Sequence, residues 1–84
     1  MHEYSIVSAL VERVEQVVVD HPGAIVRRVH VQIGAFAGVE LSLLRTAYDT
    51  FRERTVCETA ELAIEPVNGD ELTLARVEME VPDV

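Results

Sequence analysis

The spacing of apolar residues changes abruptly around residues 20–23, and this change constrains the fold more than any other feature of the sequence. Over residues 4–19 apolar side chains recur every three or four positions, which predicts an amphipathic helix. Residues 25–33 predict a strand with one buried and one polar face, because apolar and polar side chains alternate over residues 28–33. Pro22 disfavours helical backbone at the residue before it, and Gly23 favours a turn. The chain is therefore expected to open with a helix that turns directly into a strand.

A second helix and a short strand are expected in the middle of the chain. Residues 61–65 alternate around the apolar Leu62 and Ile64, which is the pattern of a short strand. Residues 55–59 would connect this strand to a helix over residues 40–54. The apolar face of that helix consists of Leu41, Leu44, Tyr48 and Phe51.

The last third of the sequence predicts a β-hairpin. Asn68-Gly69 stands between two alternating segments, and a type I′ turn needs positive φ at both central positions, which these residue types tolerate. The returning strand would cover residues 72–81. Its apolar positions change phase part-way along, so a β-bulge near Ala75 and Arg76 is expected.

These elements predict one domain over residues 1–84, in the order helix, strand, helix, strand, strand. Two helices packed on one face of a three-stranded sheet would bury both helical stripes and the apolar face of the sheet. We therefore expect an α/β fold of the α+β type. A domain this short buries only about two-thirds of its unfolded surface, so a homodimer, with or without exchange of strands, is also compatible with the sequence.

Composition argues against several classes of function. The chain has 15 acidic and 7 basic residues, a formal net charge of −8, which argues against nucleic acid as a partner. Every basic residue is arginine, so the chain offers neither a P-loop lysine nor a lysine Schiff base. No apolar run is long enough to cross a membrane and no basic signal region opens the chain, so we expect a soluble, cytoplasmic protein.

No group of residues suggests catalysis. Cys57, the only cysteine, allows neither an internal disulfide nor a cysteine-rich zinc site within one chain, and we expect it to be a small buried side chain. His21 is expected in an exposed turn, and His30 on the polar face of the first strand, where a surface role is favoured over metal ligation. Without a nucleophile or an acid–base pair, the chain is predicted not to be an enzyme.

Met1-His2-Glu3 carries the clearest chemistry in the sequence. The terminal amine, the amide of His2 and its imidazole can close two low-strain chelate rings around one metal ion, and the amide or carboxylate of Glu3 could supply a fourth donor. Such a site requires a metal that displaces an amide proton, which among common biological divalent ions means Cu(II) or Ni(II). By itself, however, this start is also typical of a structurally tolerant chain end.

Three blocks of the sequence together resemble a known family. The first is residues 1–7, which open the first helix. The second joins residues 31–34 to 38–40, and the third combines residues 60–65 with 69–72. In content and order these blocks resemble the HypA/HybF family of nickel metallochaperones for hydrogenase maturation. The resemblance spans nearly the whole chain, and the first block is its most specific part.

The resemblance implies a function and a site. His2 would be the nickel ligand, and the Met1 amine with the backbone amides of His2 and Glu3 would complete a planar Ni(II) site. The chain would deliver Ni(II) to a nickel-handling GTPase and to the large subunit of a [NiFe]-hydrogenase, as some relatives also do for urease. The alternative is a non-catalytic interaction module that docks to the GTPase without transferring metal.

The sequence departs from the family in one respect. The family carries a four-cysteine zinc-binding module between its second and third strands, whereas here Val67 runs directly into Asn68-Gly69 with no cysteine. We therefore expect the module to be absent between about residues 67 and 69, and no structural zinc in this chain. Either an engineered deletion sealed by a turn or a natural zinc-less relative would account for this.

Overall fold

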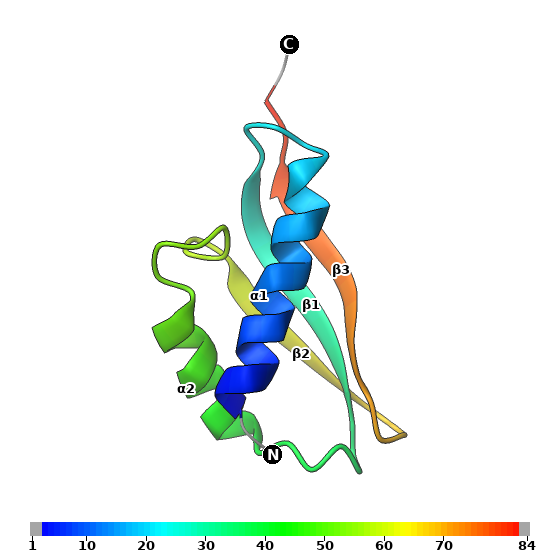
Figure 1. Cartoon of the computed structure of the whole chain (residues 1–84). Helices are drawn as coiled ribbons and strands as arrows, with labels where there is room; N and C mark the ends of the chain where they lie inside the picture. The colour runs from blue at the N-terminus through cyan, green and yellow to red at the C-terminus, as the bar shows by residue number, and fades with distance from the viewer. Residues whose placement is uncertain (1–2, 83–84) are drawn as a thin grey trace.

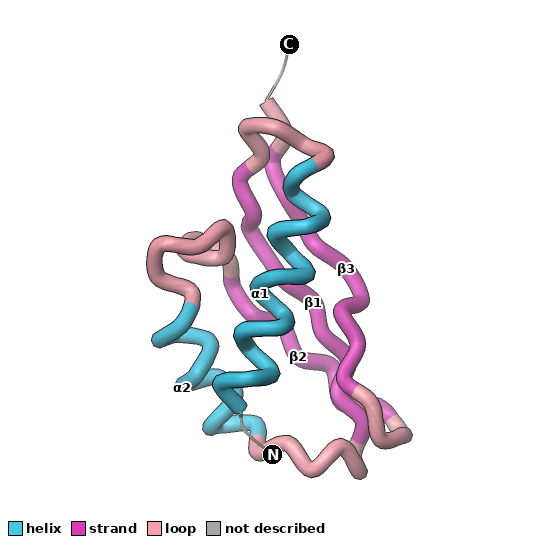
Figure 2. The backbone as a smooth tube through the Cα atoms, in the orientation of Figure 1, coloured by secondary structure: helices cyan, strands magenta, loops and turns pink. Residues whose placement is uncertain are grey.

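Two helices cover one face of a three-stranded sheet in the computed structural model of the chain, which describes residues 3–82 (Figure 1). Figure 2 shows the same two layers, with the helices in cyan and the strands in magenta. The α+β fold and the order helix, strand, helix, strand, strand are confirmed. The elements are α1 (Glu3–Val19), β1 (Ile25–Gly34), α2 (Leu41–Phe51), β2 (Glu61–Val67) and β3 (Leu72–Glu80).

The core between the helices and the sheet is almost entirely aliphatic. The alternation predicted for β1 is confirmed from Arg28 onward, where Val29, Val31 and Ile33 are buried against the helices and the polar residues between them lie on the open face of the sheet. At the start of the strand the register shifts between Val26 and Arg28, and Ile25 is exposed. The largest side chains that are almost completely buried are Val7, Val11, Val14, Val26, Val29, Val31, Leu44, Tyr48 and Cys57.

Helix α2 is shorter than the predicted residues 40–54. Glu40 is its N-cap, and its carboxylate accepts a hydrogen bond of 2.9 Å from the backbone N–H of Leu43. The helix ends at its C-cap, Arg52, and Arg54 takes a φ of +63°, a left-handed conformation that a helix cannot continue through. The pattern of apolar residues does not show where the helix ends, because no proline or glycine follows it there.

The predicted hairpin is wrong, because the two strands on either side of Asn68-Gly69 are not neighbours. The strand order is β2-β1-β3, in which β1 is parallel to β2 and antiparallel to β3. Among the described residues other than glycine, only Arg54 has positive φ, so Asn68 cannot be part of a type I′ turn. The Asn-Gly pair predicted a reversal of the chain correctly, but such a local signal cannot specify which strands pair.

Residues 68–71 instead cross over the end of β1. Three backbone N–H groups there donate to the crossing segment and to the end of β2: Gly34 to the Glu71 carbonyl (2.8 Å), Phe36 to the Gly69 carbonyl (2.8 Å) and Ala35 to the carbonyl of Val67, the last residue of β2 (2.9 Å). The segment that joins the two outer strands is therefore held by hydrogen bonds to the end of the strand between them.

The predicted bulge in β3 is confirmed. His30 pairs with Arg76, whereas the next residue of β1, Val31, pairs with Leu74, so Ala75 has no partner on β1. The extra residue shifts the alternation of β3 by one position. As a result, the apolar residues on both sides of the bulge face the helices, although their phases differ in the sequence.

Candidate metal centre

The predicted metal ligands are the first three residues of the chain, and the structure describes only the third of them. Met1 and His2 lie outside the described residues, and Glu3 is the first residue of the helix, with a partly exposed side chain. The first N–H groups of a helix have no acceptor within it, so the amide of Glu3 takes no part in the helical hydrogen-bond pattern. This amide can therefore lose its proton to a metal ion without breaking a bond of the helix.

Both helices begin at the same end of the molecule (Figure 1). The N-terminus of a helix carries a positive partial charge, and Glu3 and Glu40 each place a carboxylate there, one for each helix. Hydrogen bonds from Ser42 and Leu43 hold the pKa of Glu40 below its usual range. The Glu40 carboxylate is therefore bound by its own helix, whereas Glu3 is one of the predicted nickel ligands.

The other two histidines lie where the sequence predicted them. His21 is exposed in the turn after α1, and His30 lies on the open face of the sheet. The Nε2 of His30 hydrogen-bonds Glu78 and also lies 3.2 Å from Nη2 of Arg76. Arginine only donates and an ionised glutamate only accepts, so Nε2 cannot hydrogen-bond both at once, and the shorter of the two contacts is the hydrogen bond to Glu78. That hydrogen bond holds the pKa of Glu78 below its usual range and ties β1 to β3.

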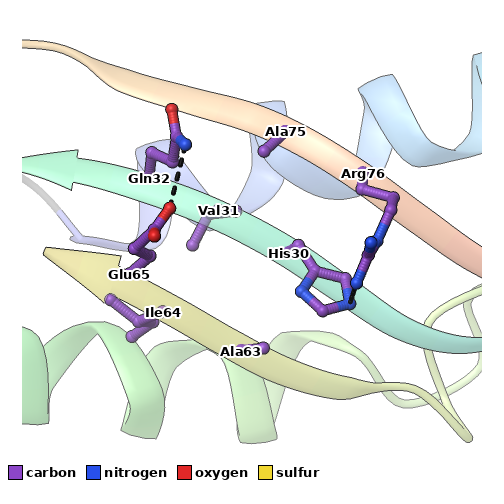
Figure 3. Close-up of a pocket in the computed structure, with 8 residues that line it drawn as sticks. All are labelled: His30, Val31, Gln32, Ala63, Ile64, Glu65, Ala75 and Arg76. Atoms are coloured by element: carbon purple, nitrogen blue, oxygen red, sulfur yellow. Dashed lines mark hydrogen bonds between the residues drawn. The ribbon is translucent and has the colours of Figure 1, made fainter. Parts of the chain in front are cut away.

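A shallow hollow of about 460 Å³ surrounds His30 on the open face of the sheet (Figure 3). Arg76 approaches the imidazole from one side, and Gln32 donates a hydrogen bond of 2.9 Å to Glu65 on the other. Across residues 3–82, no three His, Cys, Asp or Glu side chains lie close enough together to hold a metal ion. The hollow is therefore a polar surface on which side-chain hydrogen bonds link neighbouring strands.

Cys57 is free and buried, as predicted. Burial raises the pKa of its thiol to about 11, so the group is protonated at neutral pH. Because the thiolate is the form that attacks electrophiles and binds metals, Cys57 has the character of a core residue.

The sequence reasoning missed a set of side chains on α2 and its C-cap that bind backbone carbonyls at the start of β2 and just before it. Tyr48 Oη and Arg52 Nη1 each donate a hydrogen bond of 2.8 Å to the carbonyl of Ala60, and Arg45 Nη1 donates one of 3.1 Å to the carbonyl of Leu62. The three donors are spaced by three and four residues, which puts them on one face of the helix. That spacing was the available signal, although the acceptors could not be predicted from it.

Comparison with known proteins identifies the family. A family model described as "Hydrogenase/urease nickel incorporation, metallochaperone, hypA" matches residues 1–73. The chain belongs to the HypA family. The resemblance inferred from the sequence is thereby confirmed, and the matched region includes Met1, His2 and Glu3.

Curated members of the HypA family are similar over most of this chain. Hydrogenase maturation factor HypA of Shewanella baltica (strain OS185) is 49% identical over 65 residues, which make up 77% of this chain and 56% of that protein. HypA of Aquifex aeolicus (strain VF5) is 45% identical over 65 residues, with the same coverage. The chain therefore spans about half the length of the curated relatives it matches.

Solved HypA structures share the fold. The solution structure of the Ni metallochaperone HypA from Helicobacter pylori matches with a TM-score of 0.85 at 27% identity, covering 98% of this chain and 100% of that one. A second solution structure of a HypA protein gives a TM-score of 0.66 at 26% identity, covering 99% and 93%. The family is described as a metallochaperone, and no helix in residues 3–82 is long and apolar enough to span a bilayer.

Proposed function

We propose that this chain is a nickel metallochaperone that binds Ni(II) at its N-terminus and delivers it for the maturation of [NiFe]-hydrogenase, or of urease. The observation that carries the proposal is the match of a nickel-incorporation family to a region that starts at Met1. The relatives named hydrogenase maturation factors favour hydrogenase as the client. Binding and release of a metal ion need no bond-making residues, so the chain would act without catalysis of its own.

The nickel site would consist of nitrogen donors close together in the chain. The imidazole of His2, the amine of Met1 and the amide of His2 can occupy three corners of a square plane around the ion, and Glu3 supplies the fourth donor. A field of this kind suits the square-planar preference of Ni(II), although Cu(II) should compete well in vitro. The position of Glu3 at the start of α1 supports the site, because its amide makes no helical hydrogen bond.

The proposal also places the chain in a transfer pathway. By resemblance to the family, its partners would be a nickel-handling GTPase and the hydrogenase large subunit, both in the cytoplasm. Its single cysteine is buried, so nickel handling would proceed without structural zinc in these 84 residues. The negative net charge of −8 would assist encounter with a basic partner surface.

Nickel titration tests the proposal directly. A C-terminally tagged chain with a free Met1 amine should bind one Ni(II), whereas His2→Ala and an N-terminally extended form should lose most of the affinity. His21→Ala is the matched control, since it removes an exposed histidine from the turn after α1. Undiminished binding by His2→Ala or by the extended form would exclude a site built on the terminus.

The fourth donor can be identified with a single variant. Glu3→Gln removes the carboxylate and keeps the backbone amide. An unchanged affinity and an unchanged visible absorption of planar Ni(II) would favour the amide, and a large loss would favour the carboxylate.

A pull-down separates metal transfer from docking alone. The wild type and His2→Ala should both retain the GTPase partner if docking uses the folded surface, but only the wild type should restore hydrogenase activity in cells that lack their own HypA. Partner binding by both forms, together with no detectable Ni(II) binding by the wild type, would instead support an interaction module.

A further inference from the structure

Asn68 is the only asparagine in the chain, and it precedes Gly69 in the segment that joins β2 to β3. Both residues are exposed, at the end of the sheet where this segment crosses β1 (Figure 1). Asparagine is a chemically labile side chain, and it is most labile before glycine, because glycine has no Cβ to shield its backbone nitrogen. The nickel site proposed above uses neither residue.

The surroundings of the pair leave the reacting groups accessible. A Cβ added at Gly69 would meet no atom within 4 Å, so the space beside this residue is open. Among the backbone hydrogen bonds of residues 3–82 that lie outside helices and strands, none is donated by the N–H of Gly69. The nitrogen is therefore not held by an acceptor, and the side chain of Asn68 next to it is exposed.

We propose that Asn68 is a site of spontaneous deamidation, whose isoaspartyl product loosens the crossing between β2 and β3. The backbone nitrogen of Gly69 gives up its proton and attacks Cγ of Asn68. A bond forms between Cγ and this nitrogen, the bond from Cγ to Nδ2 breaks, and Nδ2 leaves as ammonia. The chain then contains a five-membered succinimide, which water opens, so the reaction needs no oxidant, reductant or cofactor.

Water can open the succinimide at either of its two carbonyl carbons. Cleavage of the bond from Cγ to the Gly69 nitrogen gives an ordinary aspartate. Cleavage of the bond from the backbone carbonyl carbon of residue 68 to that nitrogen gives isoaspartate, in which the main chain runs through Cβ and Cγ. Both products carry an additional negative charge, but only isoaspartate lengthens the main chain, by one carbon.

The crossing has no room for an additional main-chain carbon. The carbonyl of Val67, just before residue 68, accepts a hydrogen bond of 2.9 Å from the N–H of Ala35. The carbonyl of Gly69, just after it, accepts one of 2.8 Å from the N–H of Phe36 and packs closely against the end of β1. Because the two donors are adjacent in the chain, they fix the spacing of the two acceptors, and isoaspartate must break at least one of these bonds.

Incubation of the folded chain at neutral to alkaline pH tests the modification. Each deamidation should raise the mass of the tryptic peptide of residues 55–76, which contains the only asparagine, by about one mass unit. The rate should rise with pH, because the attacking nitrogen must lose its proton. The matched control is Asn68→Gln, whose side chain must close a six-membered ring and should release ammonia at least about tenfold more slowly.

Two results would overturn the proposed modification. One is a folded chain that keeps Asn68 intact over a period in which the chain unfolded in urea deamidates, since the fold would then protect the site. The other is an equal mass increase in the wild type and in Asn68→Gln. Circular dichroism establishes that the variant is folded, as expected for a change in one exposed side chain.

Hydrogen exchange followed by NMR tests the effect on the crossing. In the purified isoaspartyl form, the amide protons of Ala35 and Phe36 should exchange at least about tenfold faster than in the unmodified chain. Asn68→Asp is the matched control, because it carries the new charge without the additional main-chain carbon, and its exchange should match that of the wild type. Equal exchange in the isoaspartyl form and in Asn68→Asp would overturn the loosening of the crossing.

Discussion

The carbonyl oxygen of Gly69 occupies the space that a side chain at position 34 would need. A Cβ added to Gly34 would lie 2.3 Å from that oxygen and 2.8 Å from the backbone nitrogen of Asp70. The close approach exists because the segment that joins the two outer strands crosses the end of the central one. Gly34 is thus required by the strand order, even though its own φ is not left-handed.

Gly34→Ala should destabilise the chain by about 2–3 kcal/mol, because a methyl group there must displace the backbone of the crossing segment. Urea unfolding followed by circular dichroism measures the change in the free energy of unfolding. Gly38→Ala is the control: its φ of +71° imposes strain but a Cβ there meets no atom within 4 Å, so it should cost only about 1 kcal/mol. A Gly34→Ala variant as stable as the wild type would refute the crossing.

Tyr48→Phe and Arg52→Met should each cost only about 1 kcal/mol, because either donor alone still satisfies the buried carbonyl of Ala60. The double variant leaves that carbonyl without a donor and should cost about 1–2 kcal/mol more than the sum of the single changes. A double-mutant cycle in urea measures this coupling. Strict additivity would show that the two donors do not share the acceptor in solution.

The buried thiol of Cys57 should make stability fall at alkaline pH. Its pKa is about 11 in the folded chain against 9.0 for an ordinary thiol, so the unfolded chain loses the proton first as the pH rises. The stabilisation is complete below pH 9 and should fall by about 2–3 kcal/mol between pH 9 and 11.

The measurement for Cys57 is urea unfolding at a series of pH values, compared with Cys57→Ala. Burial also raises the pKa of Tyr48, which contributes a slope of the same sign in both forms. The chain has no lysine, so few other groups titrate in this range. Parallel pH profiles for the two forms would contradict the assignment to Cys57.

If the N-terminal site is correct, the affinity for Ni(II) should fall steeply as the pH is lowered. Binding displaces protons from the Met1 amine and from backbone amides, so the apparent association constant should drop by more than about tenfold per pH unit below the pKa of the amine. Isothermal titration between pH 6 and 8.5 in two buffers gives both the affinity and the number of protons released. Release of no protons would exclude amide ligands.

Much of the local structure follows from the sequence because its causes are local. Pro22 restricts the backbone of the residue before it, Gly23 permits the turn with its positive φ, and the alternation of residues 28–33 requires one buried face. The phase change around Ala75 identified the bulge for the same reason. The end of α2 was predicted too late. The left-handed φ of Arg54, through which the helix cannot continue, is not signalled by a proline or a glycine in the sequence.

The sequence by itself determined the helices, the strands, the bulge and the HypA resemblance centred on Met1-His2-Glu3. Only the tertiary structure decided that β1 lies between β2 and β3, and this decision made the Asn68-Gly69 segment a crossing instead of a hairpin. The physical reason is that pairing between distant strands depends on which apolar faces can be buried together, whereas a turn reports only the direction of the chain. The same arrangement brought Arg45, Tyr48 and Arg52 onto β2 and left the edge of β3 open.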